Sequence, residues 1–180
     1  ETARAVGEWS SFSIDQGRTV NVLQPGVNSV LLNRVTGSDL SNIAGSLTAN
    51  GHVYLVNPNG ITFGSTSRVD VGGIIASTLG ISNNAIMAGG PLAFQLPGNN
   101  PDAGVQNFGQ ITASQGLVAL LGRTAENAGT LSATGGTVGI ASGGTVVIDP
   151  VGDGLTTIRV TAPVPNGGDS LAINSGDITA

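Results

Sequence analysis

The chain has 180 residues, a length that suits one domain. Hydrophobic residues make up 39% of it and charged residues only 9%, against about 25% in ordinary proteins, so a charge-solubilised disordered chain is excluded. The formal net charge is -5, and the six basic residues are all Arg, scattered along the sequence. A nucleic-acid-binding or anionic-membrane-binding surface is therefore not expected.

Cysteine is absent, which excludes disulfides and thiolate metal sites. No apolar run approaches the roughly 18 residues of a membrane span, so we expect no integral membrane segment. Residues 1–4 do not resemble a signal peptide, and the chain ends within a repeat unit. We therefore expect a piece of a longer protein that continues in further coils.

The first predicted elements are two short strands, Phe12–Ile14 and Thr19–Val22, which the sequence predicts as a strand pair or as one corner of a coil. Residues 38–43 can form one turn of helix, capped by Ser38 or Asp39. Further short strands rich in β-branched residues and leucine follow along the chain. Each is bounded by Gly, Asn, Ser or Asp, which is typical of strands joined by tight turns.

The sequence Asn57-Pro58-Asn59-Gly60 separates two apolar runs. Pro58 suits the second position of a type I turn because its ring fixes φ, and Gly60 suits the fourth position. Asn57 suits the first position, where its side chain can bond the backbone two residues on. Asn57 and Asn59 can satisfy backbone groups that a sharp corner leaves unpaired. Taken alone, the segment is an ordinary turn.

Residues 81–105 interrupt the strand pattern with Pro91, Pro97 and Pro101. Because proline removes a donor from a strand ladder, this segment is expected to leave the main structure. We predict a hairpin around Gly89-Gly90-Pro91, followed by a loop. A second excursion is expected at residues 149–169, where two Gly- and Pro-rich stretches flank a predicted strand, Thr156–Thr161.

Between the two excursions the sequence repeats with a period of 20. Residues 107–113 match residues 127–133 in the pattern N-x-G-x-Φ-x-A, where Φ is aliphatic, and the pattern returns at residues 174–180. A shorter variant covers residues 45–55. Aliphatic residues alternate with small or polar ones, so each strand has one inward face. One unit cannot bury that face alone, but stacked units place like residues in continuous columns.

The repeat predicts an all-β protein with a single-stranded parallel β-helix, formed by one domain over residues 1–180 with extra-helical strand and loop excursions. A β-sandwich would not require matched Asn, Gly and aliphatic positions at 20-residue offsets. Leucine-rich repeats share the period, but the helical return segment that they need is absent. Trp9, Phe12 and Tyr54 are expected in the core or in a cap.

Residues that could carry chemistry are few. His52 is the only histidine and is expected to be a solvated turn residue. Asp149 and Asp153 lie close in a Gly-rich loop, and Arg68 and Asp70 alternate on one strand, but nothing else gathers near them in sequence. Polysaccharide-cleaving β-helices need clusters of acids and bases, often with calcium. We therefore expect no enzyme activity, no cofactor and no metal.

Several ordered motifs resemble a known family. The chain is similar to the N-terminal secretion domain of two-partner secretion exoproteins of the filamentous haemagglutinin and high-molecular-weight adhesin type, also called the haemagglutination activity domain. The resemblance covers nearly the whole chain. It rests on the residues Asn33, Arg34, Val35, Asn57, Pro58, Asn59, Gly60, Ala76, Ser77, Thr78 and Leu79, on the opening residues 9–14, and on the N-x-G-x-Φ repeats.

The resemblance implies a right-handed parallel β-helix with a non-enzymatic role. Such domains are exported through the periplasm and recognised by the periplasmic POTRA domains of a TpsB-type outer-membrane transporter. They are then threaded outward and fold at the bacterial cell surface, where they nucleate the β-helix of a long secreted adhesin. The alternatives are an adhesin domain that itself binds a host-cell receptor or glycan and, less favoured, a β-helix enzyme acting on polysaccharide.

Overall fold

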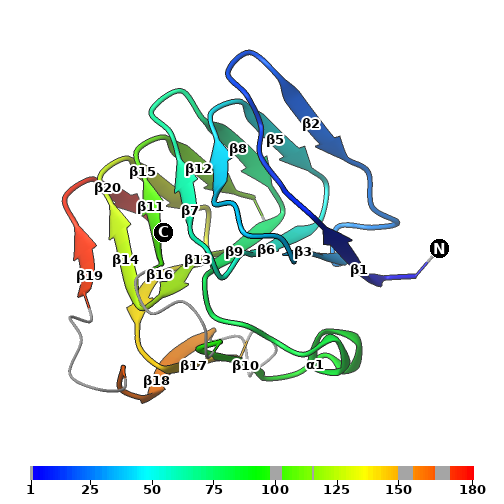
Figure 1. Cartoon of the computed structure of the whole chain (residues 1–180). Coiled ribbons are helices and arrows are strands. Elements are labelled where there is room, and N and C mark those ends of the chain that lie inside the picture. The colour runs from blue at the N-terminus through cyan, green and yellow to red at the C-terminus, as the bar shows by residue number, and fades with distance from the viewer. Residues whose placement is uncertain (1, 98–102, 115, 150–155, 165–170) are drawn as a thin grey trace.

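The computed structural model describes residues 2–97, 103–114, 116–149, 156–164 and 171–180. Within them, strands stack into three parallel sheets that wind in the repeating order A, B, C, and a smaller antiparallel sheet, D, lies outside the coils (Figure 1). The predicted parallel β-helix with extra-helical excursions is confirmed. The shape follows from the sequence, because short alternating strands gain a continuous core only by stacking.

Sheets A and C contain one strand from each coil, and sheet B contains one from each coil after the first, where Ile14 makes only an isolated bridge to Ile43. Sheet A has the order β1 (Arg4–Trp9), β3 (Val30–Val35), β6 (His52–Val56), β9 (Gly73–Ser77), β13 (Leu117–Gly122) and β16 (Thr137–Ser142). Sheet B has the order β4 (Ser41–Ile43), β7 (Ile61–Phe63), β11 (Gly104–Asn107), β14 (Thr124–Asn127) and β19 (Leu171–Asn174). Sheet C has the order β2 (Thr19–Val22), β5 (Ser46–Ala49), β8 (Arg68–Val71), β12 (Gln110–Ala113), β15 (Thr130–Ala133) and β20 (Asp177–Thr179).

The 20-residue repeat is one full coil. Asn107 pairs with Asn127 in sheet B, Ile111 with Leu131 in sheet C, and Val118 with Val138 in sheet A. In the following coil Asn127 pairs with Asn174, because the second excursion is inserted between these residues. Inward-facing aliphatic residues from the three sheets form one core along the axis, from Val35 and Leu47 through Val53 to Val118 and Leu131.

The two excursions leave the helix at the same corner, after a strand of sheet A and before a strand of sheet B. They meet in sheet D, where β17 (Thr145–Asp149) pairs antiparallel with β10 (Leu92–Gln95) and with β18 (Thr157–Ala162). The predicted hairpin around Gly89-Gly90-Pro91 is wrong. Helix α1 (Asn83–Ala88) precedes β10, which pairs with β17 some 50 residues later. Ser82 caps this helix by accepting from Ala85 N, and Gly89 ends it with a positive φ of 71°.

The strand predicted at Thr156–Thr161 is present as β18. Other residues of the predicted excursions, 98–102, 150–155 and 165–170, lie outside the described residues. The helical turn suggested for 38–43 is wrong, because Ser41–Ile43 pair with β7 as strand β4. Stacking against the next coil outweighs a short local cap there. Thr19–Val22 pair with β5, and Ile14 bridges to Ile43, so the early strands form a coil corner rather than a pair.

The middle strands of sheet A, β6, β9 and β13, are buried on both faces. The inward residues of the sheet join the axial core, while Leu32, Tyr54, Ile75 and Leu121 face outward and form a second core with the excursions. Ile86 of α1 and apolar residues of sheet D complete this second core. Strands covered on both faces read as continuous apolar runs, whereas strands of sheet C alternate, as in Arg68–Val71. The excursions therefore act as a lid over sheet A (Figure 1).

Helix α1 is six residues long, and no helix among the described residues is long and apolar enough to cross a membrane.

Adjacent residues of β9 test whether sheet A is covered on both faces in solution. Ile74 faces the axial core and Ile75 faces the excursions, and both are fully buried. We expect Ile74→Ala and Ile75→Ala each to lower the free energy of unfolding by about 2–5 kcal/mol, measured by urea denaturation. Exposed Gln110→Ala is the control, with an effect within about 0.5 kcal/mol. A near-neutral Ile75→Ala would show that the excursions do not cover sheet A.

Candidate functional site

The three motif segments singled out in the sequence lie at one corner of the β-helix. Asn33–Val35 end β3, Asn57–Gly60 follow β6, and Ala76–Leu79 include the end of β9. They are in register, since Arg34 pairs with Val56 and Val56 with Ser77. We call this stack of three segments, where sheet A passes to sheet B, the A–B corner. Both excursions also leave the coils at this corner.

The turn at the A–B corner has the predicted geometry. The amide of Gly60 donates to the carbonyl of Asn57 at 3.2 Å, which closes a four-residue turn. The amide of Asn59 donates to Asn57 Oδ1 at 2.9 Å, the bond two residues on that the sequence predicts. Gly60 has a φ of 120°, a backbone conformation that side-chain-bearing residues resist.

The two Asn side chains of this turn bind the preceding coil. Asn57 Nδ2 donates to the carbonyl of Asp39 at 2.9 Å and to Ser41 Oγ at 3.0 Å, and Asn59 Nδ2 donates to the carbonyl of Gly37 at 2.7 Å. The Asn57 side chain is fully buried. These amides thus satisfy carbonyls of the loop before β4 that no strand pairs, and they fix where that loop turns.

The segment Ala76–Leu79 ties the turn to the next coil and to the first excursion. The Ser77 carbonyl accepts from Asn57 N at 3.0 Å, and Ser77 Oγ accepts from Leu79 N at 3.0 Å. Thr78 Oγ1 donates to the carbonyl of Ala103 at 3.3 Å. Thr78 begins the excursion and Ala103 ends it, so this bond closes the loop at its base. Ala76 lies in the axial core.

The segment Asn33–Val35 connects the first coils. Asn33 Oδ1 accepts from Trp9 Nε1 at 3.1 Å, while the Arg34 guanidinium donates to the carbonyl of Ile81 at the start of the first excursion. Val35 lies in the axial core. Trp9, which is 46% exposed, makes an edge contact with Phe12, their ring centroids 6.2 Å apart. Asn33 and Arg34 thus hold two different segments against the same strand.

A second set of asparagines, recognised in the sequence only as repeat markers, forms a ladder at the corner between sheets B and C. Asn107 Nδ2 donates to Asn127 Oδ1 at 2.7 Å, and Asn127 Nδ2 donates to Asn174 Oδ1 at 2.7 Å. The Oδ1 atoms of Asn107 and Asn127 also accept from the amides of Gly109 and Gly129. Stacked Asn ladders are known from cross-β structures. The 20-residue spacing of N-x-G was the signal for this ladder.

In the part of the chain that the structure describes, the catalytic and metal-binding candidates do not come together. Among the described residues, no group of three His, Asp or Glu side chains is placed to hold a metal ion. Arg68 and Asp70 lie on the outer face of sheet C, beside Gln110 and Thr112 of the next coil. Asp153 lies outside the described residues, so its predicted closeness to Asp149 is not tested.

His52 is not the solvated turn residue that was expected. It is the first residue of β6, pairs with Gly73, and is half-buried. A Cβ on Gly73 would lie 2.3 Å from His52 Nδ1, so the imidazole fills the space that this glycine leaves. Burial, and secondarily the charge of Arg4, lowers the pKa of His52. Burial also raises the pKa of nearby Tyr54 to about 12.

Comparison with known proteins identifies what this architecture is similar to. The family described as "TPS secretion domain" matches residues 1–177. A heme/hemopexin-binding protein of Haemophilus influenzae strain Rd is 37% identical over 182 residues, covering 96% of this chain and 20% of that protein. A second heme/hemopexin-binding protein of H. influenzae is 45% identical over 71 residues, covering 39% of this chain and 8% of that protein. The chain therefore spans about a fifth of the length of the first relative.

A solved structure shares the fold. The crystal structure of the HMW1 secretion domain from H. influenzae superposes with a TM-score of 0.86 at 33% sequence identity. The superposition covers 99% of this chain and 49% of that chain.

Asn57 and Asn59 are expected to differ in their contribution to stability. Asn57→Ala removes a buried amide and leaves the Asp39 carbonyl and the Asn59 amide unpaired, so we expect a loss of about 2–3 kcal/mol in unfolding free energy. Asn59→Ala removes the bond to Gly37 from a less buried position, and we expect a loss of about 1 kcal/mol. Urea denaturation measures both losses. Equal losses would contradict the larger contribution that we assign to the buried Asn57 side chain.

His52 is expected to make stability depend on pH. Its pKa is lower in the folded chain than in the unfolded chain, where it is about 6.5, so the unfolded state binds more protons between these values. The contribution of neutral His52 to the free energy of unfolding is complete above the pKa of the unfolded chain, and it is lost as the pH drops below that pKa. Between about pH 7.5 and pH 5.5, the urea midpoint should fall more in the parent than in His52→Gln. Equal falls would contradict this role for His52.

Proposed function

The chain belongs to the TPS secretion domain family, and from that premise we propose that it is the non-enzymatic secretion module of a larger exported adhesin-type exoprotein. It is recognised, while unfolded in the periplasm, by the POTRA domains of a TpsB-type outer-membrane transporter. It then passes outward and folds at the cell surface, where its coils nucleate the β-helix of the chain that follows.

The match of the TPS secretion domain family to residues 1–177 carries the proposal, and the regular stacking of like coils supports it. Ile178 continues the inward column of Ile111 and Leu131, which are fully buried, yet Ile178 is 44% exposed. Asn174 is the last member of the Asn ladder and accepts from Asn127. The last coil thus has the same inward pattern as the coils before it. A further coil of the same pattern would bury it and extend the ladder.

The way the coils pair supports folding that follows emergence. Each parallel strand pairs only with the coils directly before and after it, so a coil can add as soon as its neighbour has formed. The chain has no cysteine to form a disulfide in an oxidising periplasm, and it has few charged and few aromatic side chains. In this pathway the domain folds outside the cell.

Export tests whether folding of the coils is required. Val118 is fully buried in the axial core, and Val118→Asp should prevent the coils around β13 from stacking. In cells that produce the parent protein and its transporter, we expect secretion to slow by about tenfold or more, measured by pulse-chase. Binding of the urea-unfolded variant to the purified POTRA domains should stay unchanged.

Gln110→Asp is the matched control, since it places the same carboxylate on the exposed face of sheet C in the same coil. It should change neither secretion nor binding. Normal secretion of Val118→Asp would show that folding does not drive export. Failure of the unfolded parent to bind the POTRA domains would overturn the proposed recognition of an unfolded chain.

A further inference from the structure

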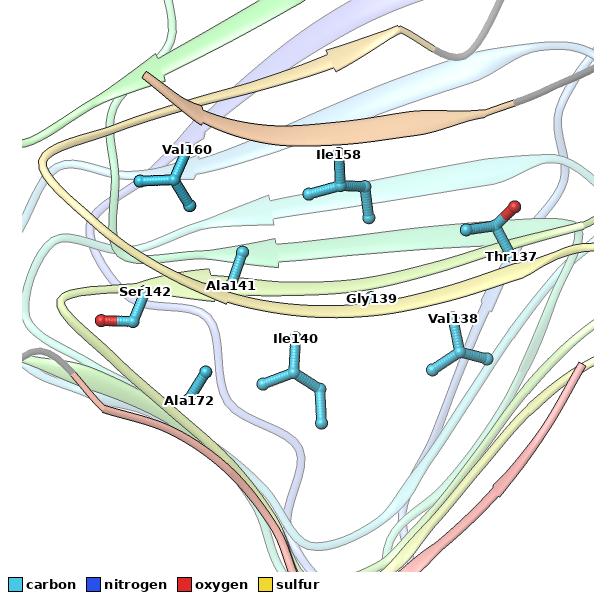
Figure 2. Close-up of a pocket in the computed structure, with 9 residues that line it drawn as sticks. All are labelled: Thr137, Val138, Gly139, Ile140, Ala141, Ser142, Ile158, Val160 and Ala172. Carbon is cyan, nitrogen blue, oxygen red and sulfur yellow. The ribbon is translucent and has the colours of Figure 1, made fainter. Parts of the chain in front are cut away.

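An open groove runs along the last strand of sheet A. β16 is the end strand of that sheet, so one of its backbone edges has no pairing strand among the described residues. The groove has a volume of about 560 Å³ and lies along this edge of β16, with residues of β18 and Ala172 of β19 on its sides (Figure 2). Its lining consists of Thr137, Val138, Gly139, Ile140, Ala141, Ser142, Ile158, Val160 and Ala172.

The groove has an inner and an outer wall on either side of the β16 edge. Val138 and Ile140 form the inner wall with Ala172, and they continue the inward columns of β13. Ile158 and Val160 of β18 form the outer wall, on the opposite side of β16 in Figure 2. An extended strand paired with β16 would place one set of alternate side chains against each wall.

The outer wall can lie close to β16 because two glycines leave space for its side chains. A Cβ on Gly139 would lie 2.1 Å from Ile158 Cδ1, and a Cβ on Gly143 would lie 2.6 Å from Val160 Cγ1. The outward position that Gly139 occupies is Ala119 in β13 and Ile75 in β9. In this column the outward residues become smaller toward the end of the sheet, from Ile75 through Ala119 to Gly139, which lets Ile158 lie against β16.

We propose that this groove receives the sheet-A strand of a further coil, and that β18 selects a strand with apolar side chains on both faces. The inference rests on the proposed nucleating function and adds a specificity element to it. β13 shows what such a strand looks like, since Val118 and Leu120 face the axial core and Ala119 and Leu121 face the second core.

Strands of the other two sheets do not fit the outer wall. Strands such as β12 alternate, with Gln110 and Thr112 facing outward, and would place a polar side chain against Ile158 or Val160. Such burial without a partner is unfavourable. β18 therefore fixes which of the three strands of the incoming coil pairs with β16, and with it the rotational register of every coil that follows. The first relative's length, of which this chain matches 20%, leaves ample chain for such coils.

The test adds one coil to the full chain. Residues 133 and 180 hold the same place in the repeat, so a copy of residues 114–133 fused after Ala180 supplies strands for sheets A, B and C in order. Hydrogen exchange read by mass spectrometry reports whether the copied Leu117–Gly122 strand is protected. We expect protection, and we expect Val160→Asn to reduce it by about tenfold or more, because a carboxamide replaces both methyl groups of Val160 in the outer wall.

Two controls keep the result specific. Val160 is 47% exposed, and Met87→Asn makes a comparable polar change on a 50% exposed residue of α1, away from the groove, so it should leave the added strand protected. Protection of the chain's own β12 and β15 reports that the domain is folded. If Val160→Asn disturbs those strands, Val160→Thr replaces it in the test. Threonine keeps the shape of the valine side chain and adds a polar group, so it should also reduce the protection of the added strand.

The outcomes separate the two claims. Equal protection of the added strand with and without the outer-wall change overturns selection by β18 and leaves nucleation standing. An added coil that is unprotected in every variant overturns nucleation and the inference with it. Replacing the copied apolar strand by a copy of Gln110–Ala113 should abolish protection, and full protection of that strand would also contradict selection.

Discussion

Buried asparagine amides at the corners are the interactions on which the β-helix depends. Within the sheets, backbone groups pair with the coils before and after, but at each corner the chain leaves the ladders and its polar groups need other partners. Asn57 and Asn59 supply them for the loop of the preceding coil, and the ladder through Asn107, Asn127 and Asn174 supplies them at another corner. An amide serves here because it donates and accepts at once.

The second organising feature is that, within the part of the chain that the structure describes, sheet A alone is covered on its outer side. Its strands therefore hold two apolar faces. The first excursion is anchored to them at the A–B corner, by Arg34 at Ile81 and by Thr78 at Ala103, and the second excursion joins the first where β17 pairs with β10. The described residues place no such cover over sheets B and C, whose outer residues are mostly polar, as in Arg68–Val71 and Gln110–Ala113. The family motifs thus gather where a regular solenoid is joined to an irregular attachment, which is why they fall outside the 20-residue repeat.

The repeating part of the fold could be predicted from the sequence because inward aliphatic residues and N-x-G corners recur at a fixed distance. The turn at Asn57–Gly60 could be predicted as well, since its residues are local. The carbonyl groups of Gly37 and Asp39 that it binds belong to a loop without a repeat signal. A local hairpin was predicted where β10 lies, but the partner of β10 is β17, far along the chain, and nothing local encodes that pairing. The environment of His52 depends on Gly73 in the next coil.

The pairing of β10 with β17 also sets an order of events. Coils can form one after another from local contacts, but the second core joins Leu32 and Tyr54 to Val146 and Ile148, so it closes only when both excursions are present. A chain that emerges from its N-terminus therefore passes through a stage in which several coils are stacked while the outer side of sheet A is still bare. At that stage the bare apolar face of sheet A can aggregate. The stage lasts until β17 has emerged and packed against that face.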